Sequence, residues 1–254
     1  MTPVPVLAGE RVFKVRTGMM MTCAILEDRT VRCWGRGYLG DGQERNSELG
    51  VPTPQTVTGL GNVADVALSS SGLHSCAVLQ DQTAYCWGHQ RDGELGDGTL
   101  TRRLTPVRVR GLNNVRQMIM GATFSCALLT NDEVRCWGGN YMGELGYEAQ
   151  GPVVMTDRGP ALGGFRELTA GAYHACGRRF DRSTYCWGFN YDGQLGDGTT
   201  ESRPCNTQTC PTDCKLGAWS SYGLCTSDGS SSRSKELTKD SNGKWCHNKA
   251  AVTP

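Results

Sequence analysis

The sequence predicts an all-β protein made of four related repeats and a short cysteine-rich tail. Three observations support this prediction. A Cys-Trp-Gly motif occurs four times, and each motif follows another cysteine by ten positions. No segment shows the sustained i, i+3, i+4 apolar spacing that indicates a helix. The motifs begin at Cys33, Cys86, Cys136 and Cys186, at steps of 53, 50 and 50 residues, so one repeat is about this long.

Each repeat contains the same succession of short apolar runs and turns. A run rich in β-branched residues comes first, as at 63–67 and 115–119. In the second repeat we then expect two strands at 76–79 and 83–87 around a polar turn at 80–82. A loop that ends in Leu-Gly follows every Cys-Trp-Gly motif, with glycines that supply the positive φ of tight turns. The repeat is therefore a small antiparallel β unit.

The eight cysteines of the repeats are spaced as hairpin partners. With the second hairpin centred on Asp81, Cys76 lies directly opposite Cys86, about 4.5 Å away at a non-hydrogen-bonded pair, which a disulfide can bridge. Zinc sites usually have closely spaced cysteine pairs, and the chain has only four histidines. Reduced, buried cysteines are the other alternative. We predict four disulfides, Cys23–Cys33, Cys76–Cys86, Cys126–Cys136 and Cys176–Cys186. Disulfides predict a secreted protein, located outside the cytosol.

The repeats resemble the regulator of chromosome condensation repeat family over residues 9–204. The matching motifs in the second repeat are His74-Ser75-Cys76-Ala77-Val78, Cys86-Trp87-Gly88, Gly93-Glu94-Leu95-Gly96-Asp97-Gly98-Thr99 and Pro106-Val107. The resemblance implies a β-propeller with one four-stranded blade per repeat, and the paired cysteines are similar to the secreted branch of the family. The family usually closes a ring of seven blades. Four repeats could therefore be an incomplete ring, close alone, stack as an open array or pair with another chain.

Two sets of repeat residues are candidates for packing and for binding. The tryptophans of the four motifs would be equivalent residues buried between neighbouring blades: Trp34, Trp87, Trp137 and Trp187. The loops after the motifs mix aromatic and small polar residues, as recognition surfaces do. We name seven of these loop residues the contact rim: Tyr38, His89, Arg91, Tyr141, Met142, Phe189 and Tyr191.

The tail, residues 205–254, has a different composition and is expected to be a small disulfide-rich β module. It resembles a thrombospondin type-1 repeat, because 204–211 matches the end of one such repeat and 213–225 the start of the next. The resemblance implies an aromatic–cation stack of Trp219, Tyr222 and Arg233, although Tyr222 stands where the family has a second Trp. A Ser-rich linker is the alternative. Five cysteines leave one unpaired for another chain: Cys205, Cys210, Cys214, Cys225 and Cys246.

Composition and motifs exclude several classes of function. With 26 Lys+Arg against 25 Asp+Glu, the charge gives no field that favours nucleic acid or an anionic membrane. No apolar run reaches the roughly 20 residues of a membrane span, and the first nine residues lack the pattern of a signal peptide. No catalytic, metal-binding or cofactor-binding motif is met. Four arginines could still contact a polyanion or glycan from one strand face: Arg102, Arg103, Arg108 and Arg110.

These observations predict an extracellular protein-binding or adhesive module without catalytic activity, which acts on a protein partner or as a homo-oligomer. The alternative is a structural subunit of an extracellular fibre or coat, which a low blade count and an unpaired cysteine would suit. A nuclear exchange-factor activity, implied by the family name, is disfavoured by the paired cysteines.

Overall fold

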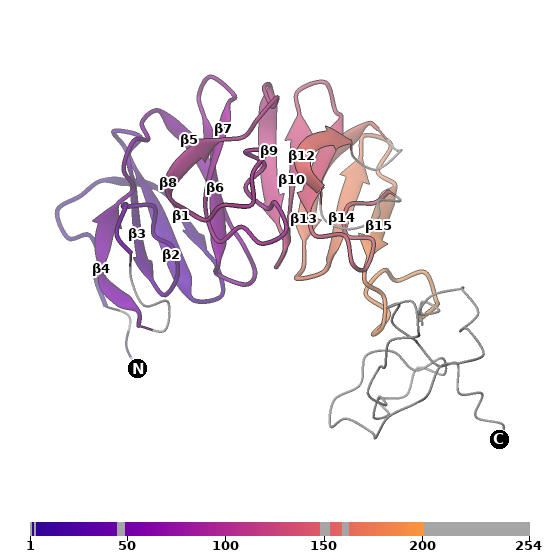
Figure 1. The fold of residues 1–254 in the computed structure, drawn as a ribbon, viewed down its shortest axis with the longest axis horizontal. Helices are drawn as coiled ribbons and strands as arrows, with labels where there is room; N and C mark the ends of the chain where they lie inside the picture. The colour runs from indigo at the N-terminus through magenta and orange to yellow at the C-terminus, as the bar shows by residue number, and fades with distance from the viewer. Residues whose placement is uncertain (1, 3, 45–48, 148–152, 159–162, 201–254) are drawn as a thin grey trace, which may run out of the picture. The chain divides into compact units, whose positions relative to one another are not determined.

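The computed structural model describes residues 2, 4–44, 49–147, 153–158 and 163–200 (Figure 1). Over these ranges the chain forms β-strands joined by turns, and no helix occurs in them. The all-β expectation is confirmed. Contacts divide the chain into two units, Met1–Phe189 and Asn190–Pro254, and all the described strands belong to the first.

The strands form four antiparallel sheets in chain order, which we call blades 1 to 4. Within each blade, strands that are consecutive in the sequence are neighbours in the sheet, from the first strand to the last. The strands of blade 1 are β1 (Val12–Thr17), β2 (Met21–Leu26), β3 (Val31–Gly35) and β4 (Val51–Thr56). Those of blade 2 are β5 (Val63–Leu68), β6 (His74–Leu79), β7 (Ala84–Gly88) and β8 (Arg103–Arg108). Blade 3 has β9 (Val115–Met120), β10 (Phe124–Leu129), β11 (Val134–Gly138) and β12 (Val153–Arg158), and blade 4 has β13 (Phe165–Ala170), β14 (His174–Arg179) and β15 (Thr184–Gly188).

The central hairpin of each blade is closed by the same turn. In blade 2 the side chain of Asp81 accepts hydrogen bonds from the backbone N–H and the hydroxyl of Thr83, while Gln82 between them adopts a φ of 65°. Asp, Asn and Ser/Thr stabilise such turns through these short-range bonds. The turn fixes the register that places Cys76 opposite Cys86, with their Cα atoms 4.0 Å apart.

All four predicted hairpin disulfides are present, each between directly opposed residues. The three disulfides of blades 1 to 3 are completely buried, whereas Cys176 and Cys186 are partly exposed. The sequence alone made the four pairs look equivalent. The difference arises from packing, because another blade follows each of the first three along the chain.

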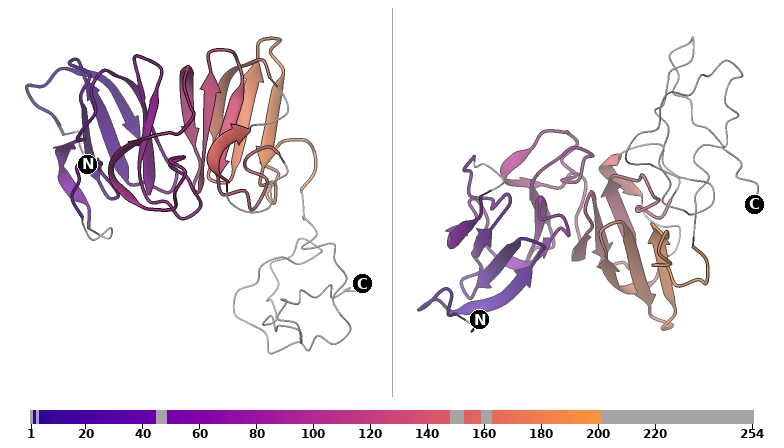
Figure 2. Two further views of the ribbon diagram at one scale, coloured as in Figure 1. Left: turned by 45° about the horizontal axis from the view of Figure 1, so that its top comes forward. Right: turned by 90° about the horizontal axis from the view of Figure 1, so that it is seen from below.

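The hydrophobic core lies between the blades, which pack side by side in chain order (Figures 1 and 2). We call the face that meets the preceding blade the first face, and the opposite face the second face. Between blades 1 and 2, for example, Ile25 and Val31 of one second face form a cluster with Val63 and Val66 of the next first face. Each single sheet is too thin to bury its own apolar residues, so stacking supplies the core.

The motif tryptophans occupy equivalent positions but differ in burial. Trp87 and Trp137 are fully buried in the clusters between blades 1 and 2 and between blades 2 and 3. Trp34 and Trp187 are only partly buried. The expectation of equal burial is therefore wrong for these two. For Trp34 the reason is that, in the described part of the chain, no blade packs against the first face of blade 1.

Candidate functional site

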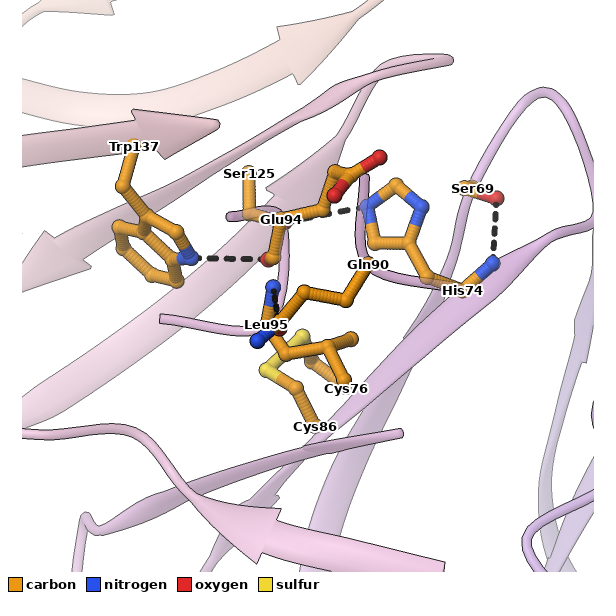
Figure 3. Close-up of a disulfide and its surroundings, with 9 residues drawn as sticks. All are labelled: Ser69, His74, Cys76, Cys86, Gln90, Glu94, Leu95, Ser125 and Trp137. Carbon is orange, nitrogen blue, oxygen red and sulfur yellow. Dashed lines mark hydrogen bonds between the residues drawn. A yellow bond between two sulfur atoms is a disulfide. The ribbon is translucent and has the colours of Figure 1, made fainter. Parts of the chain in front are cut away.

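The loop after each Cys-Trp-Gly motif is held by one amide side chain. In blade 2 the Gln90 Oε1 atom accepts a hydrogen bond of 3.0 Å from the Leu95 N–H, and its Nε2 atom donates to Asp97 Oδ1 at 2.6 Å. Leu95 is thereby fixed in the core cluster that contains Cys76 and Cys86 (Figure 3). Asn140 and Asn190 accept the same backbone bond in the loops of blade 3 and of the second unit. Side-chain hydrogen bonds within each loop therefore hold its backbone in place.

The same loop also binds the next blade. The Glu94 carbonyl accepts a hydrogen bond of 2.8 Å from the Trp137 indole and one of 2.9 Å from the Ser125 hydroxyl, both in blade 3 (Figure 3). The Trp87 indole donates to the Tyr38 carbonyl of blade 1 in the equivalent way. Trp187 donates to the Glu144 carbonyl in the same way. These three tryptophans therefore pack between blades and also anchor the loop of the blade before them.

One buried cluster superficially resembles a Ser-His-Glu catalytic arrangement. His74 Nε2 lies 3.2 Å from Ser125 Oγ, and Glu94 belongs to the same group of residues (Figure 3). However, Ser125 is 0% and His74 1% exposed, so neither can reach a substrate. Burial lowers the pKa of His74 to about 3 and raises that of the Glu94 carboxyl. We assign the cluster a structural role in joining blades 2 and 3.

The contact rim residues of the first unit follow the Trp-Gly ends of β3, β7, β11 and β15. Tyr141 is the most exposed of the four rim aromatics, and its hydroxyl donates a 2.6 Å hydrogen bond to Asp92 in the neighbouring loop. Asp92, through its backbone N–H, is in turn tied to the Glu94 side chain. Tyr191 is exposed too but belongs to the second unit, so its position relative to the others is not assigned.

Sequence reasoning missed a second set of residues at the same end of the blades. The turns between the first two strands of each blade, which we call the inner turns, comprise residues 18–20, 69–73, 121–123 and 171–173. The Leu73 carbonyl accepts a 2.8 Å bond from His89, and the Tyr173 carbonyl one from Phe189. Inner turns and contact rim are therefore adjacent. The sequence signal for these turns was an apolar residue directly before the histidine that opens the second strand, as Leu73 before His74 and Tyr173 before His174.

Exposed apolar side chains gather where these two sets meet. Leu73 and Tyr173 are exposed, and the ring of Tyr173 contacts that of Phe189 edge to face with centroids 6.3 Å apart. Met19, in the inner turn of blade 1, is exposed as well. Blades 1 to 4 thus each contribute to one end of the first unit, and this end is the candidate functional site.

The four arginines proposed to contact a polyanion are largely engaged within the protein. Arg103 forms a salt bridge of 2.7 Å with Asp97, and Arg102 pairs with Glu44 and lies over the Tyr38 ring. Arg108 donates to Asn113. Strand β8 ends at Arg108, so Arg110 lies beyond the strand face on which the sequence placed it. This geometry does not form an open cationic stripe.

Other predicted sites lie outside the described residues or find no counterpart within them. The stack of Trp219, Tyr222 and Arg233 and all five tail cysteines fall in 201–254, outside the described ranges. Across the residues that are described, no three His, Cys, Asp or Glu side chains come together as metal ligands. In the same residues no helix is long and apolar enough to cross a membrane.

Two family models match parts of the chain. Models of the regulator of chromosome condensation (RCC1) repeat match residues 81–128 and 183–221, and a second model of this repeat matches 115–144 and 165–194. The match to 183–221 extends past residue 204, into the region that the sequence assigned to the tail. The thrombospondin-like module is not supported by these matches.

Curated relatives are similar to part of the chain. The chain is 33% identical to human E3 ubiquitin-protein ligase HERC2 over 109 residues, which are 42% of this chain and 2% of the ligase. It is 33% identical to the ultraviolet-B receptor UVR8 of Arabidopsis thaliana over 113 residues, 42% of this chain and 25% of the receptor. The chain therefore spans a quarter or less of these relatives.

The fold is similar to that of larger proteins. The crystal structure of Kap60 bound to yeast RCC1 (Prp20) matches with a TM-score of 0.68 and 21% identity, over 84% of this chain and 52% of that chain. Human WBSCR16 matches with a TM-score of 0.65 and 21% identity, over 76% and 51%. The matched part of this chain thus spans about half of each of these structures. The chain shares their β-propeller-like arrangement of blades, and parts of it match models of the regulator of chromosome condensation repeat.

Proposed function

We propose that this chain is a non-catalytic protein-binding module that acts outside the cytosol and binds its partner through the contact rim and the inner turns. RCC1-repeat proteins are typically protein-binding or regulatory. Crystal structures of yeast Prp20 concern its binding to Kap60 and, in another study, to Gsp1p and histones. Their structural similarity to this chain, at 20–21% sequence identity, supports a shared fold and not a shared partner.

The observation that carries the proposal is a set of exposed apolar and aromatic side chains on hydrogen-bonded loops and turns at one end of the first unit. Tyr141, Leu73 and Tyr173 are exposed. The backbone carbonyls of Leu73 and Tyr173 accept hydrogen bonds, and the Tyr141 hydroxyl donates one to Asp92. Aromatic residues dominate the energetic centres of protein interfaces. Side chains that are already ordered lose little further conformational entropy on binding. This end of the first unit therefore offers preformed anchors.

The extracellular location is supported by the four disulfides. Structural disulfides that occur in every repeat are typical of proteins in an oxidising compartment. A reducing cytosol would leave six thiols in the core between the blades and two partly exposed thiols on blade 4.

The test is affinity capture from the extracellular material of the source organism with the immobilised chain, followed by mass spectrometry. The chain and its Phe180→Ala variant should retain the same protein, whereas Tyr141→Ala should lose most of it. Phe180 is the matched control, because it is exposed but lies at the hairpin turn, at the other end of β14. Tyr141→Phe keeps the ring and removes only the bond to Asp92.

The result with Tyr141→Phe separates direct contact from loop positioning. Retention close to that of the unmodified chain shows that the ring itself contacts the partner. Equal capture by the unmodified chain and Tyr141→Ala, or no protein above the bead background, would contradict the proposed function.

A further inference from the structure

One side chain joins the first strands of blades 3 and 4 by binding the unpaired edge of β13. Gln117 of β9 accepts a 3.0 Å hydrogen bond from the Leu168 N–H through Oε1 and donates one of 2.8 Å to the Leu168 carbonyl through Nε2. Both backbone groups are available because β13 is the first strand of its sheet, and every second residue of such a strand points its N–H and C=O away from the neighbouring strand. A primary carboxamide, which has a donor and an acceptor on one planar group, is thus matched to this edge.

The equivalent edge of β9 has no such partner. The registers align Met118 with Leu168, because they lie opposite the equivalent residues Ala127 and Gly177. The N–H and C=O of Met118 therefore also point away from β10. Among the described residues, no side chain or backbone group forms a hydrogen bond with either of them. The edge of blade 3 is open at the point where the edge of blade 4 is closed.

Asp65 stands at the position of Gln117 in blade 2, but it does not bind the next blade. Its Oδ2 atom accepts hydrogen bonds from Lys14 at 2.9 Å and from Arg16 at 2.8 Å, both in blade 1. Its Oδ1 atom accepts one of 2.9 Å from the Val66 N–H. An ionised carboxylate also has no hydrogen to donate to a carbonyl. Blade 2 therefore lacks the side chain that would close the edge of blade 3.

A cavity of about 310 Å³ lies against this open edge. The first strands of all four blades line it, together with one residue of β6: residues 16–17, 65–68, 117–120 and 168–170, and Val78. The volume is at the lower end of the range of cavities that hold small organic molecules, roughly 300–1,000 Å³. The lining includes no residue of the contact rim or of the inner turns, so this is a separate site.

We propose that this cavity binds a small molecule with a primary carboxamide, and that this group pairs with the backbone of Met118 as Gln117 pairs with that of Leu168. The amide oxygen of the ligand accepts from the Met118 N–H, and its amide nitrogen donates to the Met118 carbonyl. A carboxylate of the same size can accept the first bond, but it leaves the carbonyl unpaired and sets two acceptors against each other. The site therefore distinguishes an amide from the corresponding acid. This proposal stands or falls separately from the contact rim.

The test is a titration of the whole chain, labelled with ¹⁵N-methionine, by nuclear magnetic resonance. The probe is propionamide, and propionate of nearly the same shape is its control. We expect propionamide to shift the Met118 amide signal saturably, and propionate to bind at least about tenfold more weakly. The volume-conserving variant Met118→Leu identifies the signal, which disappears from its spectrum. The amides of the other methionines report whether the probe binds elsewhere.

Two variants of Asp65 test the pairing itself. Asp65→Gln gives blade 2 the side chain that closes the next edge in blade 3, so it should shift the Met118 signal without any probe and weaken propionamide binding at least about tenfold. Asp65→Asn is the matched control, because it removes the same charge and keeps an acceptor for the Val66 N–H but is one methylene shorter. It should bind propionamide as the unmodified chain does.

Four outcomes would overturn the proposal. The first two concern the unmodified chain: an unmoved Met118 signal at high propionamide concentration, and equal binding of propionate. The third is undiminished binding of propionamide to Asp65→Gln. The fourth is an equal loss of binding in Asp65→Gln and Asp65→Asn, because the charge at position 65 would then control the site and the pairing with Met118 would not.

Discussion

Replacement of Trp137 tests whether the interfaces between blades hold the fold together. Trp137 is fully buried between blades 2 and 3, and its indole N–H donates a 2.8 Å hydrogen bond to the Glu94 carbonyl. Two changes separate these contributions. Trp137→Phe keeps most of the packing and removes the hydrogen bond, while Trp137→Ala removes both.

The magnitudes follow from the surroundings of the ring. Trp137→Ala should lower the free energy of unfolding by roughly 3–5 kcal/mol, as large core truncations do. Trp137→Phe should cost only about 1 kcal/mol through the lost bond, because the Glu94 carbonyl still accepts from the Ser125 hydroxyl. At about 2–4 °C per kcal/mol for a domain of this size, Trp137→Ala should melt roughly 6–20 °C lower.

The assay is thermal and urea unfolding followed by near-ultraviolet circular dichroism. Trp34→Ala is the matched control, because this residue has the same place in its blade but is only partly buried. Its effect should be clearly smaller. If Trp137→Ala melts no lower than Trp34→Ala, the buried tryptophans do not hold the blades together and the reasoning is refuted.

Three further predictions concern burial, backbone and covalent structure. His74 stays neutral in the folded chain, where its pKa is about 3, whereas in the unfolded chain it takes up a proton below pH 6.5. Lowering the pH therefore lowers the free energy of unfolding, and His74 contributes about 2 kcal/mol of this loss by pH 5. His74→Gln should flatten the pH dependence of the urea midpoint, and an unchanged pH dependence would contradict this prediction. Gly96→Ala should lower the melting temperature more than Gly111→Ala. Both glycines have a positive φ (64° and 67°), but of the two only a Cβ at position 96 would meet the Trp137 indole nitrogen, at 2.8 Å. Equal melting temperatures of the two variants would show that backbone strain alone matters. Removal of one hairpin disulfide by Cys76→Ala/Cys86→Ala should lower the free energy of unfolding by roughly 2–3 kcal/mol. Urea unfolding of the variant and of the unmodified chain measures this difference. An unchanged free energy of unfolding would show that packing alone holds the hairpin.

Part of the candidate site was predictable from the sequence, because it depends on local chemistry. The Trp-Gly loops carry their own turn residues, so the contact rim could be named from Tyr141 or Phe189 without a structure. The inner turns were missed because Leu73 and Tyr173 join the rim only through backbone bonds between segments that are about 16 residues apart.

The sequence by itself determined the repeat, the hairpin register and the disulfide pairs. These features arise within about ten residues, where a turn such as Asp81 to Thr83 and the alternation of a strand leave one pairing, that of Cys76 with Cys86. Only the tertiary structure decided which equivalent residues are buried. Trp137 is fully buried but Trp34 only partly, and Val66 is buried whereas Val15 is half exposed. The physical reason is that a blade buries its apolar faces against neighbouring blades, so the environment of each residue depends on which blade stands next to it.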